Sequence, residues 1–166
     1  REQVATGDMA PVMMGSGVNA QGANALMNAI VRYFPSPERA ARDSGVDLTT
    51  GEHFVANYKP DVNLSMKVFK TIADPFIGKY SLVKVLTGVL RADSELFNTG
   101  KEVEEKSGKI YVLRGKEAIE VSELRPGDIG AMAKLNETET GDTLARKQAP
   151  ILYNAPQISK PYTYKA

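Results

Sequence analysis

The sequence has no cysteine and no tryptophan, and it has a single histidine, His53. Without cysteine the chain forms neither a disulfide nor a thiolate metal site. One histidine argues against a histidine-rich metal site and against a Ser-His-Asp triad, so we expect His53 to be an ordinary surface residue. No group of residues has the pattern of an active site, and no catalytic residue and no metal ligand is predicted.

An excess of charge and a long apolar run are also absent. The chain has 21 basic and 20 acidic residues, a net charge of +1, which gives no overall field toward nucleic acid or membrane. No stretch approaches the roughly 20 apolar residues of a membrane-crossing helix, and no signal peptide is visible. We therefore expect a cytoplasmic, monomeric protein with no membrane partner.

What the sequence does have is a glycine-rich loop at its start. The segment Pro11–Ile30 runs from apolar residues through a glycine turn into a helical pattern. Asn19 or Gln21 is suited to cap that helix, and Pro35 ends it. The pattern rests on one apolar stripe: Leu26, Met27, Ile30, Val31 and Phe34.

The loop fits no common phosphate-binding motif well. Residues 15–20 satisfy G-x-G-x-x-A, but a dinucleotide site also needs an acidic residue after a second buried strand, and the polar segment before Asp43 is no such strand. A P-loop needs lysine and Ser/Thr where Ala23 and Asn24 stand. Taken alone, the loop is a strand-to-helix turn in which glycine relieves backbone strain.

From Asn63 onward the apolar residues alternate with polar ones. Short β-branched and aromatic runs follow, separated by turn residues such as Asp93-Ser94 and Pro126-Gly127. This pattern is typical of a small closed antiparallel β-barrel. Residues 36–60 are polar and indicate a connector with one short strand near His53. The proline-containing end indicates an extended linker, and no internal repeat stands out.

Two motifs in this β region resemble domain II of bacterial elongation factor G. The segment "FKTIADPFIGKYSLVKVLTG" (Phe69–Gly88) is similar to that family's F-K, A-D-P-F-x-G-K and turn glycine. The segment "GDIGAMAKLNETETGDTLA" (Gly127–Ala145) is similar to its G-D-I-x-A and T-G-D-T-L. The two motifs occur in order along the chain, and chance is a poor explanation for both of them together.

The segment Val12–Pro37 resembles the last strand, loop and helix of the GTPase domain in the same family. The resemblance implies that the glycine loop contacts the guanine base, with Ser16 and Gly17 at the family's S-A positions and Asn19 just beyond. Gly17 replaces the usual alanine, which implies a less preorganised loop and weaker nucleotide binding.

The resemblance implies a mainly β fold, the barrel being preceded by a strand-loop-helix remnant of an α/β GTPase domain. Residues 1–58 would be the end of the GTPase domain and a connector, 59–146 the domain II barrel and 147–166 a linker into the next domain. The parent would be a ribosome-associated GTPase that drives translocation, with GTP or GDP and Mg²⁺ as its cofactors. The chain itself, without P-loop and switches, would bind no nucleotide and have no GTPase activity.

The resemblance also names the partners, which are small-subunit ribosomal RNA, the protein's own GTPase domain and its downstream domains. Basic residues outnumber acidic ones between Lys59 and Lys116, and basic side chains on a β-barrel can hold an RNA backbone without reading its sequence. Lys79, Lys84 and Arg91 are the candidate RNA-facing residues.

Two alternatives stay open. The segment Gly108–Leu124 does not follow the usual elongation factor G wording and is closer to divergent paralogues. A ribosomal-protection or release-type GTPase would have the same domains and a different task. The alternative from another class is a stand-alone β-barrel interaction module, in which the glycine loop is a plain turn.

Overall fold

The computed structural model describes residues 1–40, 43–74, 78–115 and 117–155. The chain divides into two compact units, Arg1–Ala40 and Ala41–Ala166, which we call the N-terminal unit and the β unit. Pro75 and Phe76 of the A-D-P-F motif lie outside the described residues, as do residues 156–166 of the predicted linker. No helix among the described residues has the length and apolarity needed to cross a membrane.

The N-terminal unit has two helices, α1 (Glu2–Thr6) and α2 (Ala23–Tyr33). The helix predicted from the apolar stripe is confirmed as α2, which ends where Phe34 turns extended ahead of a proline. The predicted side-chain cap is wrong, because Gly22 stands at the N-cap with a φ of 83° and no side chain caps the helix. A left-handed residue at this position favours glycine over Asn or Gln.

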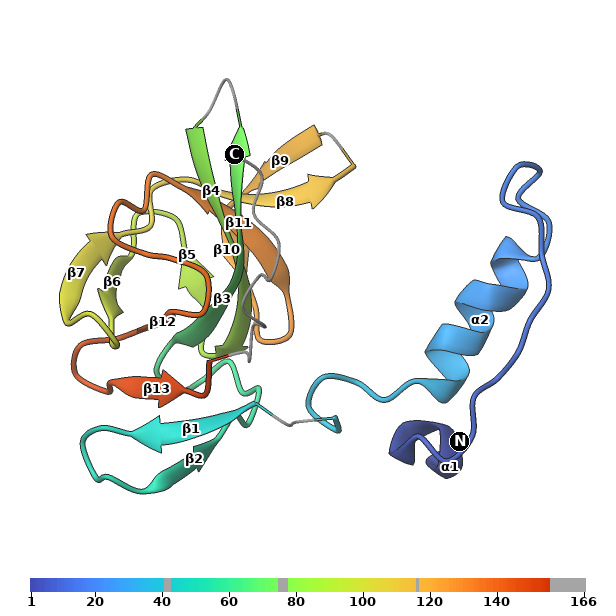
Figure 1. The fold of residues 1–166 in the computed structure, drawn as a ribbon, viewed down its shortest axis with the longest axis horizontal. Coiled ribbons are helices and arrows are strands. Elements are labelled where there is room, and N and C mark those ends of the chain that lie inside the picture. Colours follow the sequence, from blue (N-terminus) through green and yellow to red (C-terminus); the bar gives the residue numbers. More distant parts are fainter. Residues whose placement is uncertain (41–42, 75–77, 116, 156–166) are drawn as a thin grey trace, which may run out of the picture. The chain divides into compact units, whose positions relative to one another are not determined.

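The β unit is built from antiparallel pairs throughout, so the prediction of a mainly β, antiparallel fold is confirmed (Figure 1). Eight strands form one sheet in the order β7-β6-β12-β3-β4-β11-β8-β9, and β5 pairs with β10. The sheet strands are β3 (Ser65–Asp74), β4 (Gly78–Thr87), β6 (Glu95–Asn98), β7 (Val103–Lys106), β8 (Ile110–Arg114), β9 (Glu117–Val121), β11 (Ile129–Ala133) and β12 (Thr143–Ala145), and the short pair is β5 (Leu90–Arg91) with β10 (Glu123–Leu124).

A single apolar core lies inside this curved sheet. Met66 and Val68 of β3 are fully buried, as the alternating pattern from Asn63 predicts. Leu96 of β6 and Ile110 of β8 belong to the same core, although their strands lie toward opposite ends of the sheet order. The sheet therefore wraps around one core, and each buried aliphatic side chain contributes about 1.5–3 kcal/mol.

The T-G-D-T-L motif forms a turn that attaches to β3. Gly141 has a φ of 101° and its N–H donates to the carbonyl of Val68, while the N–H of Val68 donates to the carbonyl of Asp142. The Asp142 carboxylate accepts the N–H of Glu139 at 2.8 Å, which closes the turn. The same carboxylate accepts the side-chain amide of Asn98 at 2.8 Å.

The R-P-G-D-I segment forms the same turn on β4. Gly127 has a φ of 93°. Its N–H donates to the carbonyl of Val85, and the N–H of Val85 donates to the carbonyl of Asp128. The Asp128 carboxylate accepts the N–H of Arg125 at 2.8 Å. The two long strands are therefore each flanked by an equivalent Gly-Asp turn, an internal repeat of structure that the sequence analysis missed.

A second, smaller sheet joins the two ends of the β unit. Its order is β13-β1-β2, with β1 (Ser44–Asp47) between β2 (His53–Val55) and β13 (Ile151–Tyr153). The short strand expected near His53 is confirmed as β2. Segments interpreted as connector and linker thus supply three paired strands.

The inner face of this small sheet packs against the eight-stranded sheet through a second apolar cluster. Tyr153 and Ile151 of β13 lie there with Tyr58 and with Leu86 of β4. The buried Tyr153 hydroxyl is 2.7 Å from the Ser65 hydroxyl. Burial raises the pKa of Tyr153 to about 12, so this phenol stays neutral and hydrogen-bonded at ordinary pH.

Candidate functional site

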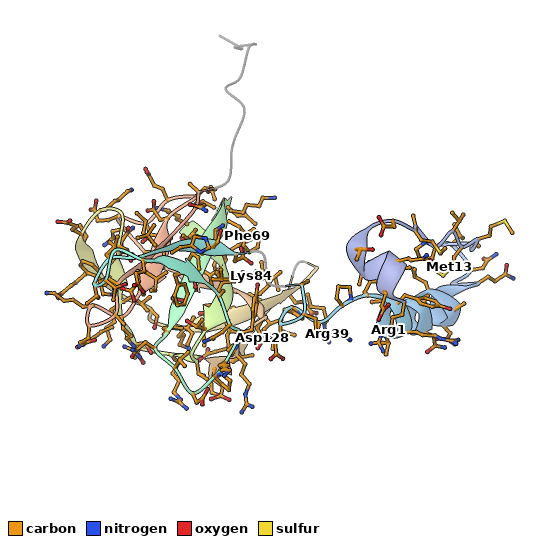
Figure 2. The ribbon with its side chains drawn as sticks, turned by 90° about the horizontal axis from the view of Figure 1, so that it is seen from below. Arg1, Met13, Arg39, Phe69, Lys84 and Asp128 are labelled. Atoms are coloured by element: carbon orange, nitrogen blue, oxygen red, sulfur yellow. The ribbon has the colours of Figure 1, made fainter. Side chains whose placement is uncertain are left out.

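The glycine loop is a tight turn closed by one pair of backbone groups. The N–H of Ser16 donates to the carbonyl of Gln21 at 2.9 Å, and the N–H of Asn19 lies 3.4 Å from the Ser16 hydroxyl oxygen. A hollow of about 330 Å³ lies against the loop, between Met13 (Figure 2), Gln21 and Leu26. The loop thus presents backbone groups beside an apolar surface.

The three loop glycines have different structural roles. A Cβ at Gly15 would lie 2.7 Å from the carbonyl oxygen of Gln21, and one at Gly22 would lie 2.9 Å from that of Met14. At Gly17 a Cβ would meet no atom within 4 Å, and the backbone there is not left-handed. Gly15 and Gly22 are required by the loop's closure, whereas the backbone at Gly17 would accept alanine.

The loop offers donors suited to a planar base edge. Within the described part of the chain, no hydrogen-bond partner is found for the N–H of Gly17, which lies at the turn between Ser16 and Asn19. Two neighbouring side chains, Met14 and Val18, are each 95% exposed and would present apolar surface to a ring. Because the segment 12–22 contains no lysine or arginine, it has no cation for a phosphate.

The three candidate RNA-facing residues lie in different surroundings. The Lys79 ammonium at the start of β4 donates to the carbonyl of Thr138. The Arg91 side chain on β5 is 70% exposed, with its Nε 3.7 Å from a carboxylate oxygen of Glu123. Lys84, in the middle of β4, is engaged in an ion pair and is only 33% exposed. The structure does not gather the three residues into one cluster. Of the two that form ion pairs, Arg91 is more exposed than Lys84.

The partner of Lys84 is Asp43, which precedes β1. The Lys84 ammonium lies 2.9 Å from the Asp43 carboxylate, and the ammonium of Lys67, directly across the β3–β4 pairing, lies 3.7 Å away. The Tyr58 hydroxyl donates to the same carboxylate at 2.7 Å, and the Lys84 ammonium lies 5.2 Å from the centre of the Tyr58 ring. We call these four residues the Asp43 cluster.

Electrostatics keeps the Asp43 cluster charged. Burial acts to raise the pKa of Asp43, but its contacts with Lys84, Tyr58 and Lys67 outweigh burial and hold that pKa below the ordinary value. Burial acts to lower the pKa of Lys84, but its contacts with Tyr58 and Asp43 raise it above the ordinary value. Each shift favours the ionised form of its group at neutral pH.

Sequence reasoning missed the role of Asp43. In the dinucleotide interpretation Asp43 would be the acidic residue for a ribose, whereas the structure has it bridging two lysines of β3 and β4. Lys67 and Lys84 lie opposite each other in the β3–β4 pairing, whose register the sequence pattern does not define. Two facing lysines repel one another and require a counter-charge.

Comparison with known proteins identifies a family for the β unit. The family model described as Elongation factor G domain 2 matches residues 63–147, which contain all strands from β3 to β12. A crystal structure of a protein from Thermus thermophilus is similar to 87% of this chain, with a TM-score of 0.67 and 25% sequence identity. The chain spans 19% of the length of that protein's chain.

Alanine substitutions in the glycine loop should have opposite effects at Gly15 and Gly17. In Gly15→Ala the new Cβ meets the carbonyl of Gln21, so the Ser16–Gln21 closure opens and the Ser16 amide exchanges faster with solvent. In Gly17→Ala the new Cβ meets no atom, and reduced backbone freedom should stabilise the loop by about 0.4–1 kcal/mol. Amide hydrogen exchange of Ser16 measures both effects. Equal exchange in the two variants would contradict the loop geometry.

Asp43→Asn should destabilise the β unit in a pH-dependent way. The variant loses a charged acceptor for Lys84 and Tyr58, and we expect a loss of roughly 1–3 kcal/mol at pH 7 in urea unfolding. Because the folded-state pKa of Asp43 is lowered, its contribution is present above the unfolded value of about 3.9 and is lost as pH falls through the folded value.

The difference between the wild type and Asp43→Asn should therefore be constant from about pH 5 to 7 and shrink at lower pH. Glu52→Gln is the matched control, since Glu52 is exposed in the turn between β1 and β2 and its carboxylate makes no hydrogen bond within the described residues. A pH-independent difference for Asp43→Asn would show that the ion pairs do not stabilise the fold.

Proposed function

Because the chain belongs to the elongation factor G domain 2 family, we propose that it is the ribosome-docking module of a translational GTPase. The observation that carries this proposal is the family match over the strands that enclose the core. In this proposal the β unit holds small-subunit ribosomal RNA on one side and its own GTPase domain on another. The parent protein would use GTP hydrolysis to drive a step of translation elongation, translocation being the step that the family resemblance favours.

The N-terminal unit has an exposed apolar helix face that is suited to pack against further protein structure. Helix α2 is amphipathic, yet only Ala29 of its residues is buried. Met27 is 61% exposed and Val31 is 77% exposed, although both belong to the apolar stripe. Because an amphipathic helix gains most of its stability by burying its apolar face, we infer that α2 packs within a GTPase domain.

In that setting we assign the loop at Ser16, Gly17 and Asn19 to the guanine base of GTP or GDP. The Gly17 N–H, for which the described residues supply no acceptor, and the lack of lysine and arginine in residues 12–22 fit contact with the base rather than with phosphate. The phosphates and Mg²⁺ are then bound by other segments of the GTPase domain. No group of three or more acidic or histidine side chains able to hold a metal ion is present among the described residues.

The β8–β9 hairpin supports the proposal that the parent protein is a divergent member of the family. The segment Gly108–Leu124, whose wording departs from that of elongation factor G, contains β8, β9 and β10. The hairpin exposes Val112 by 36% and Ile119 by 39%, and these two residues face each other across the pairing. We propose that this hairpin sets the parent apart from the principal translocase, with the domain order unchanged.

Binding to purified small ribosomal subunits tests the proposal. We expect weak binding whose association constant falls steeply with salt, by a slope of roughly 0.7–0.9 per phosphate contacted. Lys79→Ala and Arg91→Ala should each lower that slope by about one. Cosedimentation with small subunits across a series of salt concentrations measures the slope.

The matched control is Lys147→Ala, because Lys147 is 66% exposed, close to the 70% of Arg91, and is likewise paired with a glutamate. It should leave the slope unchanged. Binding that is absent, or equal at low and moderate salt, would overturn ribosome docking. An equal effect of Lys147→Ala would show that Lys79 and Arg91 have no special part in it.

A further inference from the structure

A β-bulge lies beside an exposed aromatic side chain on the longest hairpin in the fold. β3 and β4 pair over ten residues each, but the register shifts between Val68 and Lys70, which leaves Phe69 without a partner in β4. Val68 is fully buried, whereas Phe69 is 41% exposed. Strand alternation already turns Phe69 away from the buried Val68, and at the bulge the next residue, Lys70, is exposed as well.

Phe69 also lies where the backbone pairing of β3 with β12 and the following turn stops, although the Thr140 hydroxyl still bonds the Thr71 hydroxyl at 3.0 Å farther along β3. β12 pairs with β3 as far as Lys67, and Val68 exchanges hydrogen bonds with the Gly141-Asp142 turn. Phe69 is the first residue of β3 beyond these contacts. It is the most exposed aromatic side chain of the β unit within the described residues. A single exposed phenylalanine is common on protein surfaces, so a second observation is needed.

That second observation is the charge of the β3–β4 hairpin, which we call the β3–β4 ribbon. Residues 65–87 contain four lysines and one aspartate. Lys67 and Lys84 share the single carboxylate of Asp43. Lys70, next to Phe69, is exposed and has no ion-pair partner among the described residues. The ribbon therefore presents excess positive charge beside the exposed ring; Figure 2 labels Phe69 and Lys84.

We propose that Phe69 stacks on an unpaired base of ribosomal RNA while Lys70 holds the neighbouring phosphate. This inference rests on the proposed function and names the contact surface within it. An exposed aromatic ring beside a cation that is available for phosphate is a combination by which proteins hold single-stranded nucleic acid, with stacking independent of base identity. An acidic protein partner would pair with the lysines but would not require a planar ring.

The experiment measures binding of the full 166-residue chain to purified small ribosomal subunits over a series of salt concentrations. Phe69→Leu keeps an apolar side chain and should weaken binding about five- to tenfold without changing the salt slope, because stacking is not ionic. Phe69→Trp should bind as well as the wild type. Lys70→Ala should lower the slope by about one.

Ile129→Ala is the control, since Ile129 on β11 is 57% exposed and is also apolar; it should bind like the wild type. Thermal unfolding of each variant checks that the fold is intact. Wild-type affinity in Phe69→Leu, or equal losses in Phe69→Leu and Phe69→Trp, would overturn the inference alone. Failure of the wild-type chain to bind at any salt concentration would overturn the proposed function and the inference with it.

A photoreactive phenylalanine analogue at position 69 separates RNA from protein as the contact. Irradiation of the complex should attach the chain to an RNA base. Attachment to a ribosomal protein with no RNA adduct would overturn base stacking and would leave ribosome docking itself intact.

Discussion

The pairing of β3 with β4 is the interaction on which the other contacts of the β unit depend. The ribbon supplies Val68 and Val85, whose backbone groups each hold one Gly-Asp turn. It extends the sheet through β12 on one side and β11 on the other. Because these contacts attach at fixed positions along the two strands, a change of register by one residue would turn core side chains outward and separate both turns from their partners.

The same ribbon holds together the two ends of the β unit. Asp43, just ahead of β1, reaches Lys67 and Lys84 across it, and Tyr153 of β13 reaches Ser65. The N–H of Asn154 donates to the carbonyl of Ser44 at 2.9 Å, so the segments before and after the core lie in direct contact.

Local patterns in the sequence were sufficient for α2, for the long alternating strands and for the family. They were not sufficient for β1 and β13, because these strands have only four and three residues and their pairing with each other joins segments far apart in the chain. The Asp43 cluster and the bulge at Phe69 also depend on register, which is defined only when two strands are paired. The apolar stripe of α2 correctly predicted a helix. Such a stripe shows which face of the helix is apolar, but it does not show which part of the protein packs against that face.

The site predictions followed the same division. The loop at Ser16 and Gly17 was selected through the family resemblance, and the structure adds that its closure requires glycine at positions 15 and 22 rather than 17. Lys84 was selected as a basic residue on a strand, and its engagement with Asp43 became visible only in three dimensions. Chemical probing of the RNA in small ribosomal subunits, with and without the chain, tests the central claim most directly. If the β unit docks through RNA, a discrete set of nucleotides is protected and the protection is lost at high salt. Unchanged reactivity under conditions in which the chain is bound would contradict RNA docking.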